Sequence, residues 1–131
     1  MMDIDNKYGA LEYQKQTFSM MKDIHSFCID NKIAYSLSGG SLLGAIRENG
    51  FIPWDDDMDI MMDRENFEKF LKVSDIIKGY VVSRMLWIYR IQREEDYNGS
   101  LTGPTIDVFV LDRVPCSVIK QKFKIIMLRF L

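Results

Sequence analysis

The chain has 131 residues, of which 47% are hydrophobic and 27% are charged, and its formal net charge is −2. These values are typical of one globular domain, covering residues 1–131, with a sizeable core. The sequence has no basic stripe and no apolar run of transmembrane length, which argues against nucleic-acid binding and against a membrane span.

The first predicted element is an amphipathic helix over residues 11–31. Its apolar side chains recur at helical spacing, at Leu11, Phe18, Met21, Ile24 and Cys28. A short strand is predicted at residues 34–37. Gly39 and Gly40 then allow a tight turn with close backbone approach. A second helix is predicted to begin at Ser41, because helical spacing continues at Leu42, Leu43 and Ile46.

This glycine turn is a candidate phosphate site. A helix N-terminus offers free N–H groups and the positive end of a dipole to an anion, so we expect Gly39, Gly40 and Ser41 to bind donor phosphates. Arg47 would add a bidentate phosphate contact. The alternatives are an ordinary strand-to-helix turn and, for Arg47, an ion pair with an acid of residues 55–59.

Residues 57–62 alternate acidic and apolar side chains before becoming wholly apolar, which predicts a strand entering the core. Asp57 and Asp59 would then lie side by side on one face. Two adjacent carboxylates repel each other, and a divalent cation removes that repulsion. Oxygen ligands favour a hard ion, so Mg²⁺ or Mn²⁺ is the expected cofactor. The alternative is an exposed edge strand that carries charge.

The residues just before this strand leave two interpretations open. Asp55 and Asp56 either belong to the site or form a solvated acidic loop. Trp54 either packs against that loop or offers its ring to a quaternary ammonium group.

Further along the chain, Asp63 can cap a helix whose buried face carries Phe67, Phe70 and Leu71. Residues 80–83 and 86–93 predict a hairpin, residues 96–100 a loop, residues 105–111 a strand, and the apolar residues from Val118 onward a helix of a core. This order of elements predicts an α/β fold with a mixed sheet packed against helices.

Asp107 is the one acid in the apolar strand at residues 105–111. Buried alone, its carboxylate would cost several kcal/mol. We therefore expect it to join Asp57 and Asp59 from a neighbouring strand and to complete a metal site for phosphoryl or nucleotidyl transfer. The alternative is an aspartate that caps a loop at the strand end.

The chain resembles the LicD family of phosphocholine transferases, related to the fukutin-type ribitol-phosphate transferases, in two segments: Ser-Gly-Gly-Ser-Leu-Leu-Gly-Ala-Ile-Arg (residues 38–47) and Gly-Phe-Ile-Pro-Trp-Asp-Asp-Asp-Met-Asp-Ile (residues 50–60). The similarity spans about residues 35–70 and resumes at residues 106–109. It implies a nucleotidyltransferase-like fold and transfer of a phospho-alcohol from a CDP-activated donor, such as CDP-choline, to a cell-surface glycan of the lipopolysaccharide or teichoic acid type.

Two other functions stay open. One is a nucleotidyltransferase acting on a small molecule or protein, and the other is a non-catalytic, metal-binding fragment. Family members are about twice this length, so we expect an N-terminal fragment, truncated at its C-terminus, that is inactive by itself. Two free thiols, Cys28 and Cys116, and a start unlike a signal peptide predict a cytoplasmic protein at the inner face of the membrane.

Overall fold

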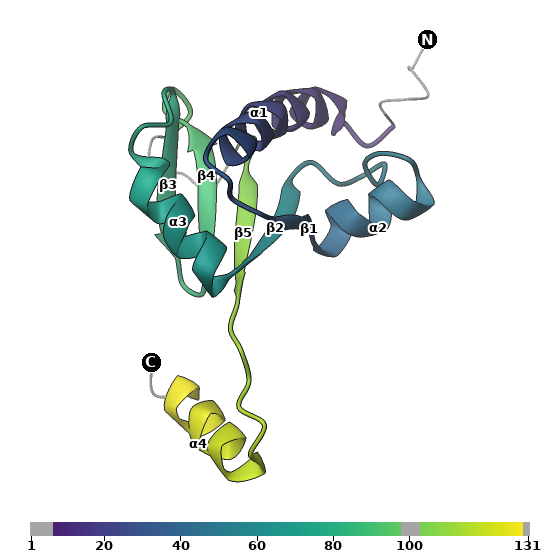
Figure 1. The fold of residues 1–131 in the computed structure, drawn as a ribbon. Coiled ribbons are helices and arrows are strands. Elements are labelled where there is room, and N and C mark those ends of the chain that lie inside the picture. The colour runs from purple at the N-terminus through teal and green to yellow at the C-terminus, as the bar shows by residue number, and fades with distance from the viewer. Residues whose placement is uncertain (1–6, 98–102, 130–131) are drawn as a thin grey trace.

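The computed structural model describes residues 7–97 and 103–129 (Figure 1). Over these residues the chain forms four helices and five strands. In chain order they are α1 (Leu11–Asp30), β1 (Ser36–Leu37), α2 (Gly39–Arg47), β2 (Met58–Asp63), α3 (Arg64–Ser74), β3 (Tyr80–Met85), β4 (Ile88–Arg93), β5 (Ile106–Leu111) and α4 (Val118–Arg129). None of these described helices combines the length and the apolar character needed to cross a membrane.

The strands form one mixed sheet in the order β1-β2-β5-β4-β3. β2 and β5 are parallel, while the other neighbouring strands are antiparallel. The predicted α/β class with a mixed sheet is therefore confirmed. Parallel pairing of β2 with β5 brings two segments about 50 residues apart in the sequence side by side at the centre of the sheet.

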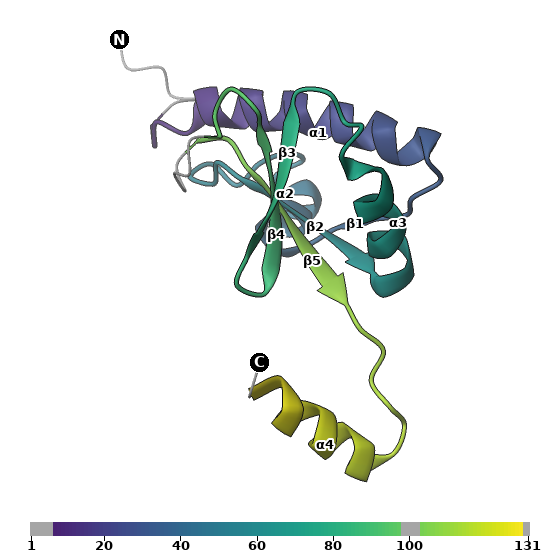
Figure 2. The ribbon, with the colours of Figure 1, turned by 90° about the vertical axis from the view of Figure 1, so that its left-hand side faces the viewer.

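The hydrophobic core lies on one face of the sheet, beneath α1 and α3 (Figure 1 and Figure 2). Its fully buried side chains come from both helices and from the central strands: Met20, Ile24, Cys28, Ile60, Met62, Phe67, Phe70, Ile91, Ile106 and Val108. Successive residues of a strand point to opposite faces, so Asp59, Arg90 and Asp107 lie on the other face. The core thus fixes the register that brings these polar side chains together.

Two predicted boundaries near the glycine turn are wrong. Helix α2 begins at Gly39 rather than at Ser41, because the Leu42 N–H already donates to the Ser38 carbonyl at 3.0 Å. Strand β1 covers two residues rather than residues 34–37. The Ala34 N–H donates instead to Oδ1 of Asn66 on α3, at 2.8 Å. Ala34 is therefore hydrogen-bonded to the helix rather than paired with a strand of the sheet.

The later elements follow the predictions with small shifts, except that Leu71 is 37% exposed and lies outside the buried face expected for α3. Strand β2 begins at Met58, so Asp57 lies in the preceding loop. Asp63 caps α3, as predicted, by accepting a hydrogen bond from the Asn66 N–H at 2.8 Å. The hairpin turns at Leu86, with φ of 53°, so β3 extends to Met85. The acidic start at residues 1–6 and part of the loop predicted at residues 96–100 lie outside the described residues.

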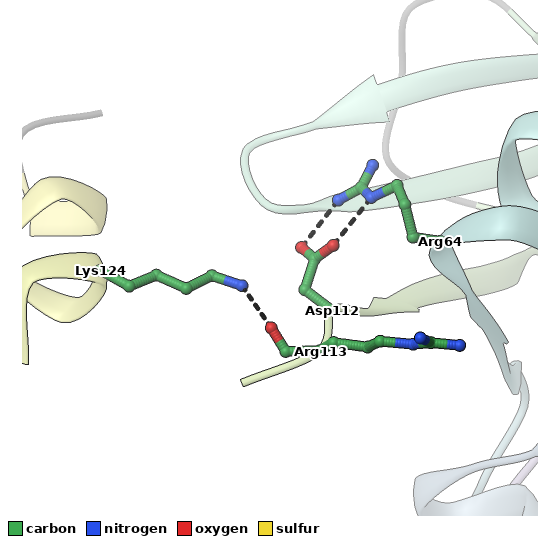
Figure 3. A network of polar contacts seen from close by, with 4 residues as sticks. All are labelled: Arg64, Asp112, Arg113 and Lys124. Carbon is green, nitrogen blue, oxygen red and sulfur yellow. Dashed lines mark hydrogen bonds and ion pairs between the residues drawn. The ribbon is translucent and has the colours of Figure 1, made fainter. Parts of the chain in front are cut away.

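Helix α4 stands away from the sheet at the end of an extended segment (Figure 1 and Figure 2). Figure 3 shows the contacts around this segment: Arg64 forms two hydrogen bonds with Asp112, at 2.9 and 2.8 Å, and Lys124 Nζ donates to the Arg113 carbonyl at 2.8 Å. The core role expected for α4 is not met among the described residues, because its apolar side chains are exposed, including Ile119 at 81% and Phe123 at 66%.

Candidate functional site

Three aspartates converge where β2 and β5 run side by side. Asp59 and Asp107 are direct partners in the parallel register, and Asp57 lies in the loop that leads into β2. One carboxylate oxygen from each of the three lies within 4.8 Å of the others. The predicted convergence is confirmed, whereas the catalytic and metal-binding roles of these residues stay predictions.

The acidic loop extends the same cluster. Oxygens of Asp55, Asp56 and Asp57 also lie within 4.8 Å of one another, so Asp57 belongs to both groups. Asp55 is half-buried and its side chain shares a hydrogen bond with Asp57, while Asp56 is exposed. The site interpretation therefore fits Asp55, which faces the cluster, and the solvated-loop interpretation fits Asp56, which is exposed.

The N-terminus of α2 holds Asp59 in place. The Asp59 N–H donates to Ser41 Oγ at 2.7 Å, and the Ser38 N–H donates to the Asp59 carbonyl at 2.9 Å. The Gly40 N–H hydrogen-bonds the Asp59 carboxylate, which works to lower its pKa. One of the N–H groups expected to be free at this helix end, that of Gly40, is thus already bonded to a carboxylate of the chain itself.

Both glycines are needed for close approach. A Cβ on Gly39 would lie 2.7 Å from Oδ2 of Asp59, and a Cβ on Gly40 would lie 2.5 Å from Oδ2 of Asp55. Gly39 also has φ of 48°, a conformation that side chains disfavour. Close backbone approach is confirmed, but the approaching groups are carboxylates; phosphate binding by Gly39, Gly40 and Ser41 stays a prediction.

Arg47 is not among the residues that the structure brings together. It lies in the last turn of α2, at the opposite end from Gly39. Its Nε pairs with Oε1 of Glu48 at 2.9 Å, and its side chain is half exposed. The alternative of an ion pair with an acid of residues 55–59 is therefore wrong, and a phosphate role for Arg47 stays a prediction.

Arg90 is a site residue that the sequence analysis missed. Asp107 was expected to have other acids as its only polar partners, but it forms an ion pair with Arg90. Arg90 faces Asp107 across the antiparallel β4–β5 pair. Its Nε and Nη2 donate to Oδ1 and Oδ2 of Asp107 at 2.7 and 3.0 Å, and the two side chains are only 14% and 9% exposed. The available signal was a lone cation in the apolar segment Ile88-Tyr89-Arg90-Ile91, which mirrors the lone acid in β5.

A second polar side chain on β4 was also missed. Gln92 lies two residues after Arg90 and therefore on the same face of the strand. It is 3% exposed, and its Nε2 has no hydrogen-bond partner in the part of the chain that the structure describes. The site-bearing face of β4 is thus polar at both positions.

The carboxylates are under electrostatic strain. Burial raises the pKa of Asp57 from 3.8 to about 6, and the hydrogen bond that protonated Asp57 donates to Asp55 and the charges of Asp55, Asp107 and Asp56 add to the rise. Burial also raises the pKa of Asp59, followed by the charges of Asp57 and Asp107. The repulsion predicted between neighbouring carboxylates is therefore present in the folded chain.

This donor set fits a hard divalent cation. All three converging groups offer carboxylate oxygens, which Mg²⁺ and Mn²⁺ prefer. Two oxygens on one Mg²⁺ lie about 3 to 4 Å apart, so oxygens within 4.8 Å of one another need only small side-chain rotations to share one ion. A cation would also offset the burial and the mutual repulsion that raise the pKa values of Asp57 and Asp59.

Trp54 packs against another aromatic ring. Its indole makes an edge-to-face contact with Tyr8 at 5.8 Å between ring centroids, although the side chain remains 61% exposed. This contact fits the packing interpretation of Trp54. Recognition of a quaternary ammonium group by this ring stays a prediction.

Comparisons with known proteins show the family of the chain. The family described as "LicD/FKTN/FKRP, nucleotidyltransferase domain" matches residues 32–122. The lipopolysaccharide cholinephosphotransferase LicD of Haemophilus influenzae is 34% identical over 124 residues, covering 83% of this chain and 46% of that protein. An uncharacterized protein of Rickettsia typhi is 41% identical over 91 residues, covering 60% of this chain and 29% of its own length.

The chain thus spans about half, or less, of the length of these curated relatives. The matched region includes the glycine turn, the acidic loop, β2, β4 and β5, and hence every residue of the carboxylate cluster. The chain belongs to the LicD/FKTN/FKRP family of nucleotidyltransferase domains.

Proposed function

We propose that this chain carries the metal- and phosphate-binding part of the active site of a metal-dependent phosphotransferase. The enzyme moves a phosphocholine-like phospho-alcohol from a CDP-activated donor to a cell-surface glycan. The observation that carries the proposal is the convergence of Asp57, Asp59 and Asp107 beside the N-terminus of α2. Family membership and similarity to a lipopolysaccharide cholinephosphotransferase support the substrate class.

In this proposal Asp57, Asp59 and Asp107 hold the metal ion, either Mg²⁺ or Mn²⁺. When bound, the ion supplies positive charge to the phosphate oxygens as charge develops during transfer. The backbone of Gly39–Ser41 orients the donor phosphates. The glycan hydroxyl attacks the phosphorus next to the alcohol; the new oxygen–phosphorus bond forms as the bond to CMP breaks.

The hydroxyl proton needs an acceptor in this reaction. Asp55 is our candidate, because it is hydrogen-bonded to Asp57 and lies outside the set of three acids. A carboxylate in this position accepts the proton as the glycan oxygen bonds to phosphorus. Replacing Asp55 by asparagine should therefore lower kcat more than it changes metal affinity.

A cavity beside the acidic loop offers room for part of a substrate. It has a volume of about 590 Å³ and is lined by Gly40, Ser41 and Asp55 as well as by Phe18 and Phe51. Aromatic walls next to a carboxylate suit an alcohol that carries a methylated ammonium group. This chemistry supports a phosphocholine-like donor over an uncharged polyol.

The cellular location is part of the same proposal. Cys28 and Cys116 are both free thiols, which supports a reducing, cytoplasmic compartment. A glycan acceptor that is linked to a membrane lipid would bring the reaction to the inner face of the membrane.

The test is the product of the reaction. Because the chain by itself is expected to be inactive, a complete protein that carries this domain is incubated with CDP-choline, lipo-oligosaccharide and MgCl₂, and the nucleotide products are separated by chromatography. We expect metal-dependent release of CMP, with loss of release in Asp59→Asn and full release in Asp30→Asn, an exposed acid outside the cluster.

Two results would contradict the proposal. Attachment of a nucleotide to the acceptor would favour nucleotidyl transfer, the chemistry that gives the family domain its description. Metal binding without turnover of either kind would favour a non-catalytic role for this chain.

A further inference from the structure

Arg90 connects the carboxylate cluster to β4. Both oxygens of Asp107 accept hydrogen bonds from its guanidinium, in the planar two-point arrangement that fixes a carboxylate most strongly. Both side chains are largely withdrawn from solvent, at 14% and 9% exposure. The hydrogen bonds with Asp107 raise the pKa of Arg90, and the charges of Asp107 and Asp57 add to the rise.

Asp107 therefore stands between Arg90 and the proposed metal position. One of its oxygens lies within 4.8 Å of oxygens of Asp57 and Asp59. A carboxylate oxygen has two lone pairs, so an oxygen bonded to an arginine N–H still has one to offer. The ion pair holds the plane of the Asp107 carboxylate while leaving it able to bind a cation.

The charges of these four groups have a simple balance. Asp57, Asp59 and Asp107 bring three negative charges when ionised, and Arg90 offsets one of them. One divalent cation then neutralises what remains. Without Arg90 the same three carboxylates would keep one uncompensated negative charge after binding the ion.

We propose that Arg90 is a positioning residue with two effects. It holds Asp107 in the orientation that a small divalent ion needs. Its positive charge also lowers the affinity of the site for the cation, so that one ion binds and can exchange. The proposal rests on the proposed metal-dependent function and goes beyond it, because it concerns a residue outside the acidic motif. Arg90 acts through Asp107 and does not bind the metal.

The two effects can be separated by two substitutions. Arg90→Gln removes the charge and the two-point contact, so Mn²⁺ should bind about tenfold more tightly, as expected when a nearby positive charge in a partly screened site is lost. Arg90→Lys keeps the charge but not the planar fork, so its Mn²⁺ affinity should stay within about threefold of the unsubstituted protein. Ca²⁺ tolerates irregular geometry better than small ions do, so both variants should prefer Mn²⁺ over Ca²⁺ less strongly.

The experiment measures Mn²⁺ and Ca²⁺ binding to the full chain by calorimetry, with free Mn²⁺ followed by electron paramagnetic resonance. Arg93→Gln is the matched control: it lies on the same strand but on the opposite face, and its nearest carboxylate, Glu95, is 4.0 Å away. It should leave both affinities unchanged. If Arg90→Gln is unfolded without metal, Mn²⁺ binding is measured instead as the Mn²⁺ concentration at which half of the protein has folded. Refolding by Mn²⁺ is then the expected result.

The outcomes are distinct. Unchanged or weaker Mn²⁺ binding in folded Arg90→Gln, or an equal gain in Arg93→Gln, would overturn the inference and leave the proposed function standing. A tenfold gain in Arg90→Lys would overturn the charge effect, and unchanged discrimination against Ca²⁺ would overturn the positioning effect. If the unsubstituted protein binds no Mn²⁺ at millimolar concentration, both the inference and the proposed function fail.

Discussion

Replacing Asp57 by asparagine should stabilise the metal-free protein and weaken its response to metal. Burial, then Asp55 and the other acids, raise the pKa of Asp57 from 3.8 to about 6. Because the folded value lies above the ordinary one, the folded state gains stability from the protonated group. That contribution is complete below about pH 4 and is lost as pH rises through 6. An asparagine cannot ionise and therefore avoids this loss.

The size of the effect follows from the shift. At about 1.4 kcal/mol for each pH unit, a rise from 3.8 to about 6 corresponds to about 3 kcal/mol. Asp57 is half-buried, and solvent screening reduces this figure by about half. We therefore expect Asp57→Asn to raise the free energy of unfolding at pH 7.5 by about 1.5 kcal/mol, which is about 4 to 8 °C in Tm for a small domain.

The assay is thermal unfolding in EDTA from pH 4 to pH 8, repeated at pH 7.5 with millimolar MgCl₂ or MnCl₂. Without metal, the unsubstituted protein should lose stability between about pH 4 and pH 7, whereas Asp57→Asn should lose less. With metal the order should reverse, because a ligand at a hundred times its Kd adds about 2.7 kcal/mol to the protein that binds it. Asp30→Asn, at an exposed position, controls for the loss of one negative charge.

Two results would refute this reasoning. Equal or lower stability of metal-free Asp57→Asn at pH 7.5, with the same dependence on pH, would mean that neither burial nor the neighbouring acids destabilise the ionised Asp57. Equal stabilisation of both proteins by metal would mean that Asp57 is not a ligand.

Three further substitutions test other parts of the site. Asp59→Asn should slow CMP release on the order of a thousandfold in the complete enzyme while Tm holds or rises, since it removes a metal ligand and one repelling charge; comparable rates would make this aspartate structural. Asp107→Asn should instead destabilise the metal-free protein, by about 2 to 3 kcal/mol in urea unfolding, because it leaves Arg90 largely buried without its partner; an unchanged midpoint would contradict the ion pair. Gly39→Ala should lower Tm and weaken Mn²⁺ binding, because its Cβ would lie 2.7 Å from Oδ2 of Asp59; unchanged binding would mean that this approach is not required.

The carboxylate cluster was predictable because it depends on two local patterns. The i, i+2 spacing of Asp57 and Asp59 requires only the alternation of an extended chain to bring them together. A lone acid in an apolar strand requires a polar partner. Asp107 lies beside Asp59 because β2 and β5 pair in register. The core fixes that register, since a slip by one residue would turn Ile60 and Val108 away from α1 and α3.

The partner of Asp107 was not predictable in the same way. Arg90 reaches it through the pairing of β4 with β5, and the register of that pair depends on the loop between them and on contacts far apart in the sequence. The alternation of polar and apolar residues gives the face on which Arg90 lies but not the residue opposite. A related limit explains why the sequence predicts the start of α2 two residues late: Gly39 enters the helix with a positive φ that no pattern of side chains reveals.

The groups bound by the N-terminus of α2 differ between the sequence-based prediction and the structure. The sequence predicts that α2 offers its free N–H groups to a phosphate, whereas in the folded chain the Gly40 N–H is bonded to the Asp59 carboxylate and Ser41 Oγ to the Asp59 N–H. A phosphate at this position would meet a cluster of carboxylates with the same sign of charge. A divalent ion shared by Asp57, Asp59 and Asp107 would cancel the net negative charge of these three acids and Arg90, and so would remove most of the repulsion that a phosphate meets there. We therefore propose that the glycine turn and the acidic motif act together, so that the helix end would bind an anion only once the acids hold their cation.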